Sequence, residues 1–317
     1  MKMNKLQLPY RKQNGTTLKA LVPKASCDGL ILFQDKYDPH LIYISNPVTN
    51  YFQPLPRAGK GIVGIGEWGL ARCKNHKFKV FAIYGQLRLG VLILNEKTPT
   101  PASWKSMSFA APNEMKLPFR VFSQLYLFQE EMHWLTMDVY SDNGGIDRPD
   151  YCYCIYSVDV NEHSLKRTRI PPGLLNVKLT DKTNSSSCKP LHLLSEVQGS
   201  LCVIFVYQYQ LQMFVLENRD ECLWRKLHTI HLQSLNFSGP YLQPTSFYSD
   251  QVCLVAVRGV DNSNLSDLIK VLIHDGDALC LFDSKNQETK LIGTLSKDHK
   301  LCTTYYLHSN SLVSLTS

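Results

Sequence analysis

The glycines between residues 58 and 69 are the first residues whose spacing could do chemistry. In AGKGIVGIGEWG the pattern GxGxxG occurs twice, once as Gly59, Gly61 and Gly64 and again as Gly64, Gly66 and Gly69. A dinucleotide site needs such glycines between a strand and a helix, so that the free N–H groups at the helix N-terminus meet the pyrophosphate. The segments on either side of the glycines therefore decide whether a nucleotide could bind.

Neither flanking segment fits a nucleotide site. NPVTNYFQPLPR, upstream, carries three prolines and is typical of a turn and an edge strand. LARCKNHKFKVFAIYG, downstream, shows no apolar period of 3.6, and residues 80 to 94 lack the acidic residue expected on a second strand. Lys60 is not followed by the Ser or Thr of a phosphate-binding loop. The glycines predict a strand that lacks side chains at these positions, so that another backbone can approach it closely.

The ten cysteines give no metal site by their spacing. Cys152 and Cys154 share one face of a predicted strand, but no CxxC or HxxxH pair accompanies them, so we interpret them as small buried hydrophobic residues. We expect no metal and no cofactor. The first residues, MKMNKLQLPYRKQNG, lack the apolar stretch of a secretion signal, which favours reduced thiols in the cytoplasm or nucleus.

The charge of the chain is modest. Thirty-four Lys and Arg against 27 Asp and Glu give a formal net charge of +7, and the only basic clusters are the short KNHKFK and LKRTR. Such short runs are typical of a solvated face, so we expect neither a nucleic-acid partner nor a membrane partner, and a monomer. No run of eighteen apolar residues predicts a membrane span.

Five segments repeat one pattern: a short apolar strand ends at a polar residue, and a turn and a second strand follow. The polar residue can bond its own backbone two positions on and so start the turn. Successive copies are 49, 64, 58 and 66 residues apart. The residues predicted to start these turns are Asn46, Asn95, Asp159, Glu217 and Asp283.

These repeats predict an all-β fold. Each copy follows one or two further runs rich in Val, Ile, Leu, Tyr and Phe, which makes several strands per repeat. Repetition around a central axis protects sheet edges, so we predict a β-propeller, with six blades closed by strands of both termini; five or seven blades stay open. Residues 1–18 would flank a propeller of residues 19–317. Trp104 and Trp224 are expected to pack between neighbouring sheets.

The order of several motifs resembles the F-box-associated, kelch-type β-propeller domain of plant F-box proteins. The motifs are SCDGLILF (26–33), LIYISNPVTNYFQPLP (41–56) and GIGEWGLARCKNHKFKVFAIY (64–84), and later VQGSLCVIF (197–205) and YLHSNSLVSL (306–315). The matching residues are Cys27, Gly29, Leu30, Asn46, Pro47, Thr49, Leu55, Pro56, Gly64, Gly66, Lys79 and Val80. No F-box is recognisable, because KLQLPYRKQNG (5–15) has the Leu-Pro pair but no helical spacing after it.

The resemblance implies a protein-recognition module without chemistry of its own, similar to the substrate-binding half of a ubiquitin-ligase receptor. It would bind an unknown target protein, and a Skp-type adaptor only if an F-box were supplied upstream. Recognition by loops on a rigid scaffold favours Asp147, Arg148, Tyr151 and Arg258 as contact residues, since Tyr and Arg dominate binding hot spots.

Two alternatives remain at this stage. One is a decoy or truncated receptor that cannot recruit the ligase. The other is a propeller enzyme that hydrolyses its substrate with carboxylates around the central channel. No GxSxG or HExxH motif occurs, and the carboxylates lie mainly at predicted hairpin turns. We therefore expect no catalytic residue.

Overall fold

The computed structural model describes fifteen stretches of the chain, almost all of them strands and the turns between strands. They are residues 21–57, 65–84, 88–94, 104–108, 120–121, 125–140, 150–171, 174, 191–197, 199–207, 210–231, 252–258, 270–275, 278–283 and 288–294. No α-helix occurs within these stretches, and no helix in them could cross a bilayer.

The strands form five sheets, and in each sheet neighbouring strands are antiparallel. The first sheet contains β1 (Leu21–Cys27), β2 (Leu30–Asp35), β3 (Ile42–Asn46) and β4 (Tyr51–Pro54). The second contains β5 (Ile65–Arg72), β6 (Phe78–Tyr84), β7 (Arg88–Leu94) and β8 (Lys105–Ser108).

The third sheet contains β9 (Arg120–Val121), β10 (Tyr126–Phe128), β11 (Glu131–Tyr140), β12 (Asp150–Asp159) and β13 (Leu165–Arg169). The fourth contains β14 (Leu191–Val197), β15 (Ser200–Tyr207), β16 (Gln210–Asn218) and β17 (Leu223–His231). The fifth contains β18 (Val252–Arg258), β19 (Lys270–Asp275), β20 (Ala278–Asp283) and β21 (Glu288–Thr294).

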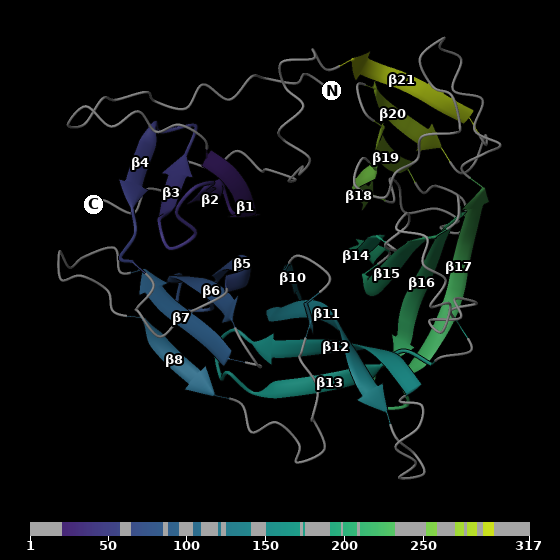
Figure 1. Cartoon of the computed structure of the whole chain (residues 1–317), viewed down its shortest axis with the longest axis horizontal. Coiled ribbons are helices and arrows are strands. Elements are labelled where there is room, and N and C mark those ends of the chain that lie inside the picture. Colours follow the sequence, from purple (N-terminus) through teal and green to yellow (C-terminus); the bar gives the residue numbers. More distant parts are fainter. Residues whose placement is uncertain are drawn as a thin grey trace.

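The sheets are arranged around a common centre, as the blades of a β-propeller (Figure 1). The strands β1, β5, β10, β14 and β18, one from each sheet, lie nearest the centre, and they contact one another in succession, β1 with β5, β5 with β10, β10 with β14 and β14 with β18. The predicted propeller is therefore confirmed. The predicted closure by strands of both termini concerns residues 1–20 and 295–317, which lie outside the described residues.

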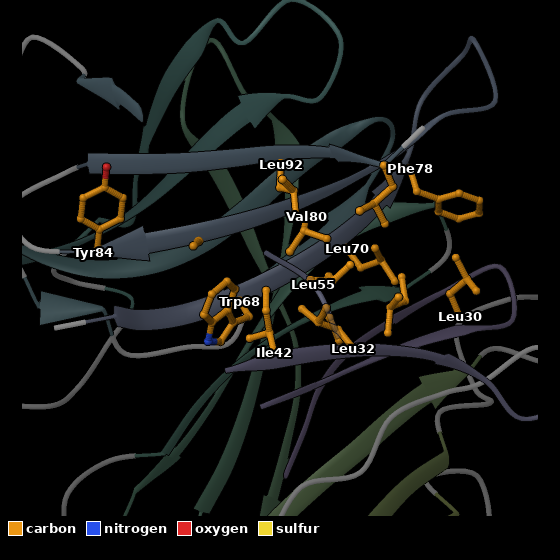
Figure 2. Close-up of a cluster of buried hydrophobic side chains, with 14 residues drawn as sticks. Leu30, Leu32, Ile42, Leu55, Trp68, Leu70, Phe78, Val80, Tyr84 and Leu92 are labelled. Carbon is orange, nitrogen blue, oxygen red and sulfur yellow. The ribbon is translucent and has the colours of Figure 1, made fainter. Parts of the chain in front are cut away.

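Hydrophobic clusters between consecutive sheets hold the propeller together. In β6 every residue is buried: Phe78, Val80, Ala82 and Tyr84 face the first sheet, whereas Phe81 and Ile83 face the third sheet. Because both faces of the blade are covered, the residues of β6 other than Lys79 are apolar, rather than alternating with polar residues. Figure 2 shows the first of these clusters, with Leu30, Leu32 and Ile42 opposite Trp68, Leu70 and Val80.

The polar residues at strand ends make the local bonds that start turns. Asn46 Oδ1 accepts a hydrogen bond of 2.9 Å from the amide of Val48, and Asp159 Oδ1 accepts bonds of 2.7 Å from the amides of Asn161 and Glu162. This local bond is what the sequence pattern predicts at these two positions.

The fourth sheet requires a correction. The turn after β16 is started by Asn218, whose Oδ1 accepts from the amides of Asp220 and Glu221, and not by Glu217. Glu217 instead pairs with Arg225 on the neighbouring strand. The shorter Asn side chain at the next position can reach the amide two residues on, which explains the shift. Asn95 lies outside the described residues, and Asp283 ends β20.

Gly69, the last glycine of the run between residues 58 and 69, lies in a strand as the sequence predicts. Gly69 lies in β5, and a Cβ there would lie 2.9 Å from Met132 Sδ and 3.0 Å from Leu125 Cβ of the third sheet. The close approach of a second sheet explains this glycine without a phosphate.

Candidate functional site

The inner strands β1 and β5 carry a lysine and a glutamate next to irregularities in strand pairing. Lys24 is skipped in the register between β1 and β2, and Gly66, which precedes Glu67, is skipped between β5 and β6. Such β-bulges re-aim side chains and are common beside active sites. Because β1 and β5 contact one another near the centre of the propeller, they bring Lys24 and Glu67 into the same region (Figure 1).

Glu67 is the carboxyl group of this region whose acidity departs most from the ordinary value. Burial raises the pKa of Glu67 to about 7, and attraction to Lys24 only partly offsets this rise. Trp68, the next residue, is fully buried in the cluster between the first two sheets, so by alternation along the strand Glu67 points away from that cluster. At neutral pH Glu67 therefore exists in both protonated and ionised forms, which is the condition for donating and accepting a proton.

A second group of polar residues, in the third sheet, has the composition of a catalytic triad. His133 Nδ1 lies 2.9 Å from Ser157 Oγ, and His133 Nε2 lies 3.8 Å from Glu131 Oε2. A serine nucleophile needs an imidazole that accepts its proton and an acid that orients the ring. Ser, His and Glu are the residue types of such a site.

The geometry of this group excludes that role. His133 Nε2 lies 3.2 Å from the carbonyl oxygen of Phe128, which only accepts, so this nitrogen carries the proton. Burial and the nearby Arg219 lower the pKa of His133 to about 4, which leaves a weak base. Both His133 and Ser157 are completely buried, so no substrate reaches them.

Glu131 serves instead as an ionic link between the third and fourth sheets. Its carboxylate accepts a bond of 2.7 Å from Lys166 and a second bond from Arg219, which lies in the turn between β16 and β17. Burial alone would raise the pKa of Glu131, but the bonds from Lys166 and Arg219 lower it below the ordinary value. Arg219 also contacts Ser157 Oγ at 3.4 Å, so the whole group fastens one blade to the next.

Of the residues predicted to contact a partner, the structure describes Tyr151 and Arg258, and both lie in strands. Tyr151 lies within β12, opposite Val139, and Arg258 ends β18, opposite Lys270. Asp147 and Arg148 lie outside the described residues.

Comparison with known proteins adds a fold likeness but no family. No family model matches the chain, and no curated protein matches it either. Among solved structures, Bacillus subtilis levansucrase is similar over 92% of this chain and 92% of its own, with 8% identity and a TM-score of 0.39. A levansucrase complexed with sucrose covers 88% of both chains at 8% identity, with a TM-score of 0.40. The N-terminal domain of Nup159 is similar over 82% of this chain and 64% of its own, with 11% identity and a TM-score of 0.33.

The expected role as a ubiquitin-ligase substrate receptor is corrected by these findings. The similar structures named above are levansucrases and a Nup159 domain, and no family model, including one for an F-box-associated domain, matches the chain. Asn46 and Gly29, two of the residues that carry the resemblance, lie at the end of a strand and in a turn.

Glu67 is the functional candidate that the sequence pattern missed. It lies inside IGEWGLAR, a strand otherwise without an acidic residue, and within the glycine run AGKGIVGIGEWG. A lone acidic residue in a strand predicted to be buried is the signal that could have identified it.

Proposed function

We propose that this protein is a carboxylate-dependent hydrolase that cleaves a glycosidic bond at the centre of the propeller, with Glu67 as the proton donor. The single observation that carries the proposal is the pKa of about 7 of a carboxyl group on an innermost strand. Displaced pKa values gather at catalytic sites because acid–base catalysis works best when the group titrates near the working pH.

Glycoside hydrolysis is the reaction that such a carboxyl group suits. A protonated carboxylic acid donates to the leaving oxygen of the glycosidic bond, while a second carboxylate attacks or activates water from the opposite side. Glu67 supports the first of these roles because its burial keeps part of the population protonated at neutral pH. Attraction to Lys24 favours the ionised form of Glu67, so the carboxyl group can also release its proton.

The test is hydrolysis of nitrophenyl glycosides and of natural oligosaccharides by the full chain and by Glu67→Gln. We expect activity that falls as pH rises through about 7, and a loss of about 100-fold or more in kcat for the variant. Glu196→Gln is the matched control, since Glu196 is an exposed glutamate on the inner strand β14. An unchanged kcat in Glu67→Gln, or no turnover of any of these substrates by the wild-type chain, would overturn the proposal.

A further inference from the structure

A buried lysine stands in the otherwise apolar middle strand of the second sheet. Lys79 lies in β6 and is 6% exposed, although its neighbours on both sides belong to hydrophobic clusters. A buried ammonium group is costly unless each of its protons finds an acceptor. Two groups accept from Lys79 Nζ, the carbonyl oxygen of Val160 and the imidazole of His163. Attraction to Lys79 partly offsets the rise that burial causes in the pKa of the nearby Cys73 thiol.

These groups meet at the contact between the second and third sheets. Cys73 Sγ lies 3.8 Å from the same Val160 carbonyl oxygen that accepts from Lys79, so the sulfur and the amine converge on one atom. His163 Nε2 lies 3.0 Å from Lys79 Nζ. Cys73 is 5% exposed, yet the next residue, Lys74, has a side chain that is 73% exposed. Cys73 and Lys79 therefore lie just beneath the surface.

The turn that contains Cys73 and the turn that contains His163 each hold a histidine with a left-handed backbone. His76 has a φ of 63° in the turn from β5 to β6, and His163 has a φ of 62° in the turn from β12 to β13. A thiol and an amine on the same carbonyl oxygen, with an imidazole beside the amine, are not needed to fill an apolar interface. A leucine and an alanine would fill it without the cost of burying a charge.

We propose that Cys73 and Lys79 form an oxidative modification site, at which a peroxide joins Cys73 Sγ and Lys79 Nζ through one oxygen atom. One molecule of hydrogen peroxide oxidises the thiol to a sulfenic acid and leaves as water. A second molecule oxidises the neutral amine to a hydroxylamine and also leaves as water. The hydroxylamine oxygen then displaces the hydroxyl group from sulfur, and a third water is released.

His163 has a defined part in this sequence. The ammonium group must lose a proton before its nitrogen can react, and the imidazole nitrogen at 3.0 Å is placed to accept it. Burial and repulsion by Lys79 lower the pKa of His163, so the imidazole is neutral and its nitrogen can accept from Lys79, but it holds a transferred proton only briefly. The site is separate from Glu67, so its test is independent of the proposed hydrolase activity.

The experiment is treatment of the folded full chain with hydrogen peroxide, followed by mass spectrometry of the intact protein and of its peptides. We expect a gain of about 14 Da, one oxygen added and two hydrogens lost, in a species that joins the peptides of Cys73 and Lys79 and that dithiothreitol reverses. The chain unfolded in guanidinium should not form this species, because unfolding separates the two groups from His163 and Val160.

Two lysine variants sharpen the test. Lys79→Met should abolish the bridged species, whereas Lys77→Met should retain it, since Lys77 is an exposed lysine of the same hairpin. If Lys79→Met does not fold, the peptide map of the wild-type chain decides alone. Oxidation of Cys73 to a sulfinic acid only, a disulfide with the neighbouring Cys27, or attachment to Lys74 or Lys77 would each overturn the proposal.

Discussion

Trp224 Nε1 donates a hydrogen bond of 3.0 Å to the carbonyl oxygen of Arg169, the last residue of β13 in the preceding sheet. The contact recurs two interfaces earlier, between the first and second sheets. Trp104 Nε1, just before β8, donates a bond of 2.9 Å to the carbonyl oxygen of Pro56, just after β4. Both tryptophans also pack against the hydrophobic cluster of their interface. The outer strand of one blade is therefore tied to the outer edge of the blade before it.

Trp224→Phe should separate the hydrogen bond from the packing. The smaller ring keeps much of the buried contact but cannot donate, so we expect a loss of about 1 kcal/mol in the free energy of unfolding. Trp224→Ala removes the ring as well and should cost about 3 to 5 kcal/mol. Urea denaturation followed by circular dichroism measures both. No loss in Trp224→Phe would show that the bond to Arg169 adds nothing, and equal losses in the two variants would show that the packing of the ring adds nothing.

Arg219→Met should weaken the contact between the third and fourth sheets. The substitution leaves the carboxylate of Glu131, 10% exposed, with Lys166 as its remaining ionic partner besides His133, and we expect a loss of about 2 to 3 kcal/mol at pH 7. Because the pKa of Glu131 is lowered in the folded state, this stabilisation is present above the unfolded pKa near 4.5 and is lost as pH falls through the folded pKa. The difference between wild type and variant should therefore shrink in acid.

Arg225→Met is the matched control for the ionic link. Arg225 and Glu217 form an exposed pair within one sheet, and such pairs contribute about 1 kcal/mol or less. A loss in Arg225→Met as large as that in Arg219→Met would mean that burial of the Glu131 carboxylate does not set the strength of the link.

The sequence predicts the strands and the repeat better than the site, for a physical reason. Continuous apolar runs such as β6, and turn-starting residues such as Asn46 and Asp159, act through neighbours within a few positions, so their consequences can be read locally. The propeller and the packing of Trp104 and Trp224 between sheets follow from this pattern, and both are confirmed.

The properties of Glu67, Lys79 and His163 depend on contacts with other sheets. The pKa of Glu67 depends on burial by the surrounding inner strands, and Lys79 contacts a carbonyl oxygen 81 positions away. His163 has no partner by sequence spacing and would be taken for a surface residue, yet it lies against Lys79. No local sequence pattern encodes contacts between residues so far apart in the chain, so these contacts can be identified only from the arrangement of the blades.

Gly69→Ala should destabilise the contact between the second and third sheets. The new methyl group would lie 3.0 Å from Leu125 Cβ, which cannot swing away, and we expect a loss of about 1 to 3 kcal/mol. Gly199→Ala is a comparison of a different kind: nothing lies within 4 Å, but φ is +73°, so the expected loss of about 1 kcal/mol comes from the backbone alone.

Shortening Met132 distinguishes these two causes. In the Gly69→Ala background, Met132→Ala removes the sulfur that lies 2.9 Å from the added methyl group, so the combined loss should be smaller than the sum of the two single losses. Combined with Gly199→Ala, the same change should add simply. Additive losses in both combinations would contradict steric contact at Gly69.

Glu67→Gln should change how the stability of the protein depends on pH. The folded carboxyl group, with a pKa of about 7, holds its proton over a range in which the unfolded group, near 4.5, has lost it. Folding therefore takes up a proton between these values, and the free energy of unfolding decreases as pH rises from 4.5 to 7. The rise in pKa corresponds to a decrease of about 3 kcal/mol at most. Gln cannot ionise, so the variant should lack this decrease. Its free energy of unfolding relative to that of wild type should therefore be higher at pH 8 than at pH 4.

Denaturation of both proteins at a series of pH values measures this difference, in which the contributions of the other titrating groups cancel. Parallel curves for wild type and Glu67→Gln would show that Glu67 ionises in the folded protein as it does in water, and the proton donor of the proposed hydrolase would then have to be a different residue.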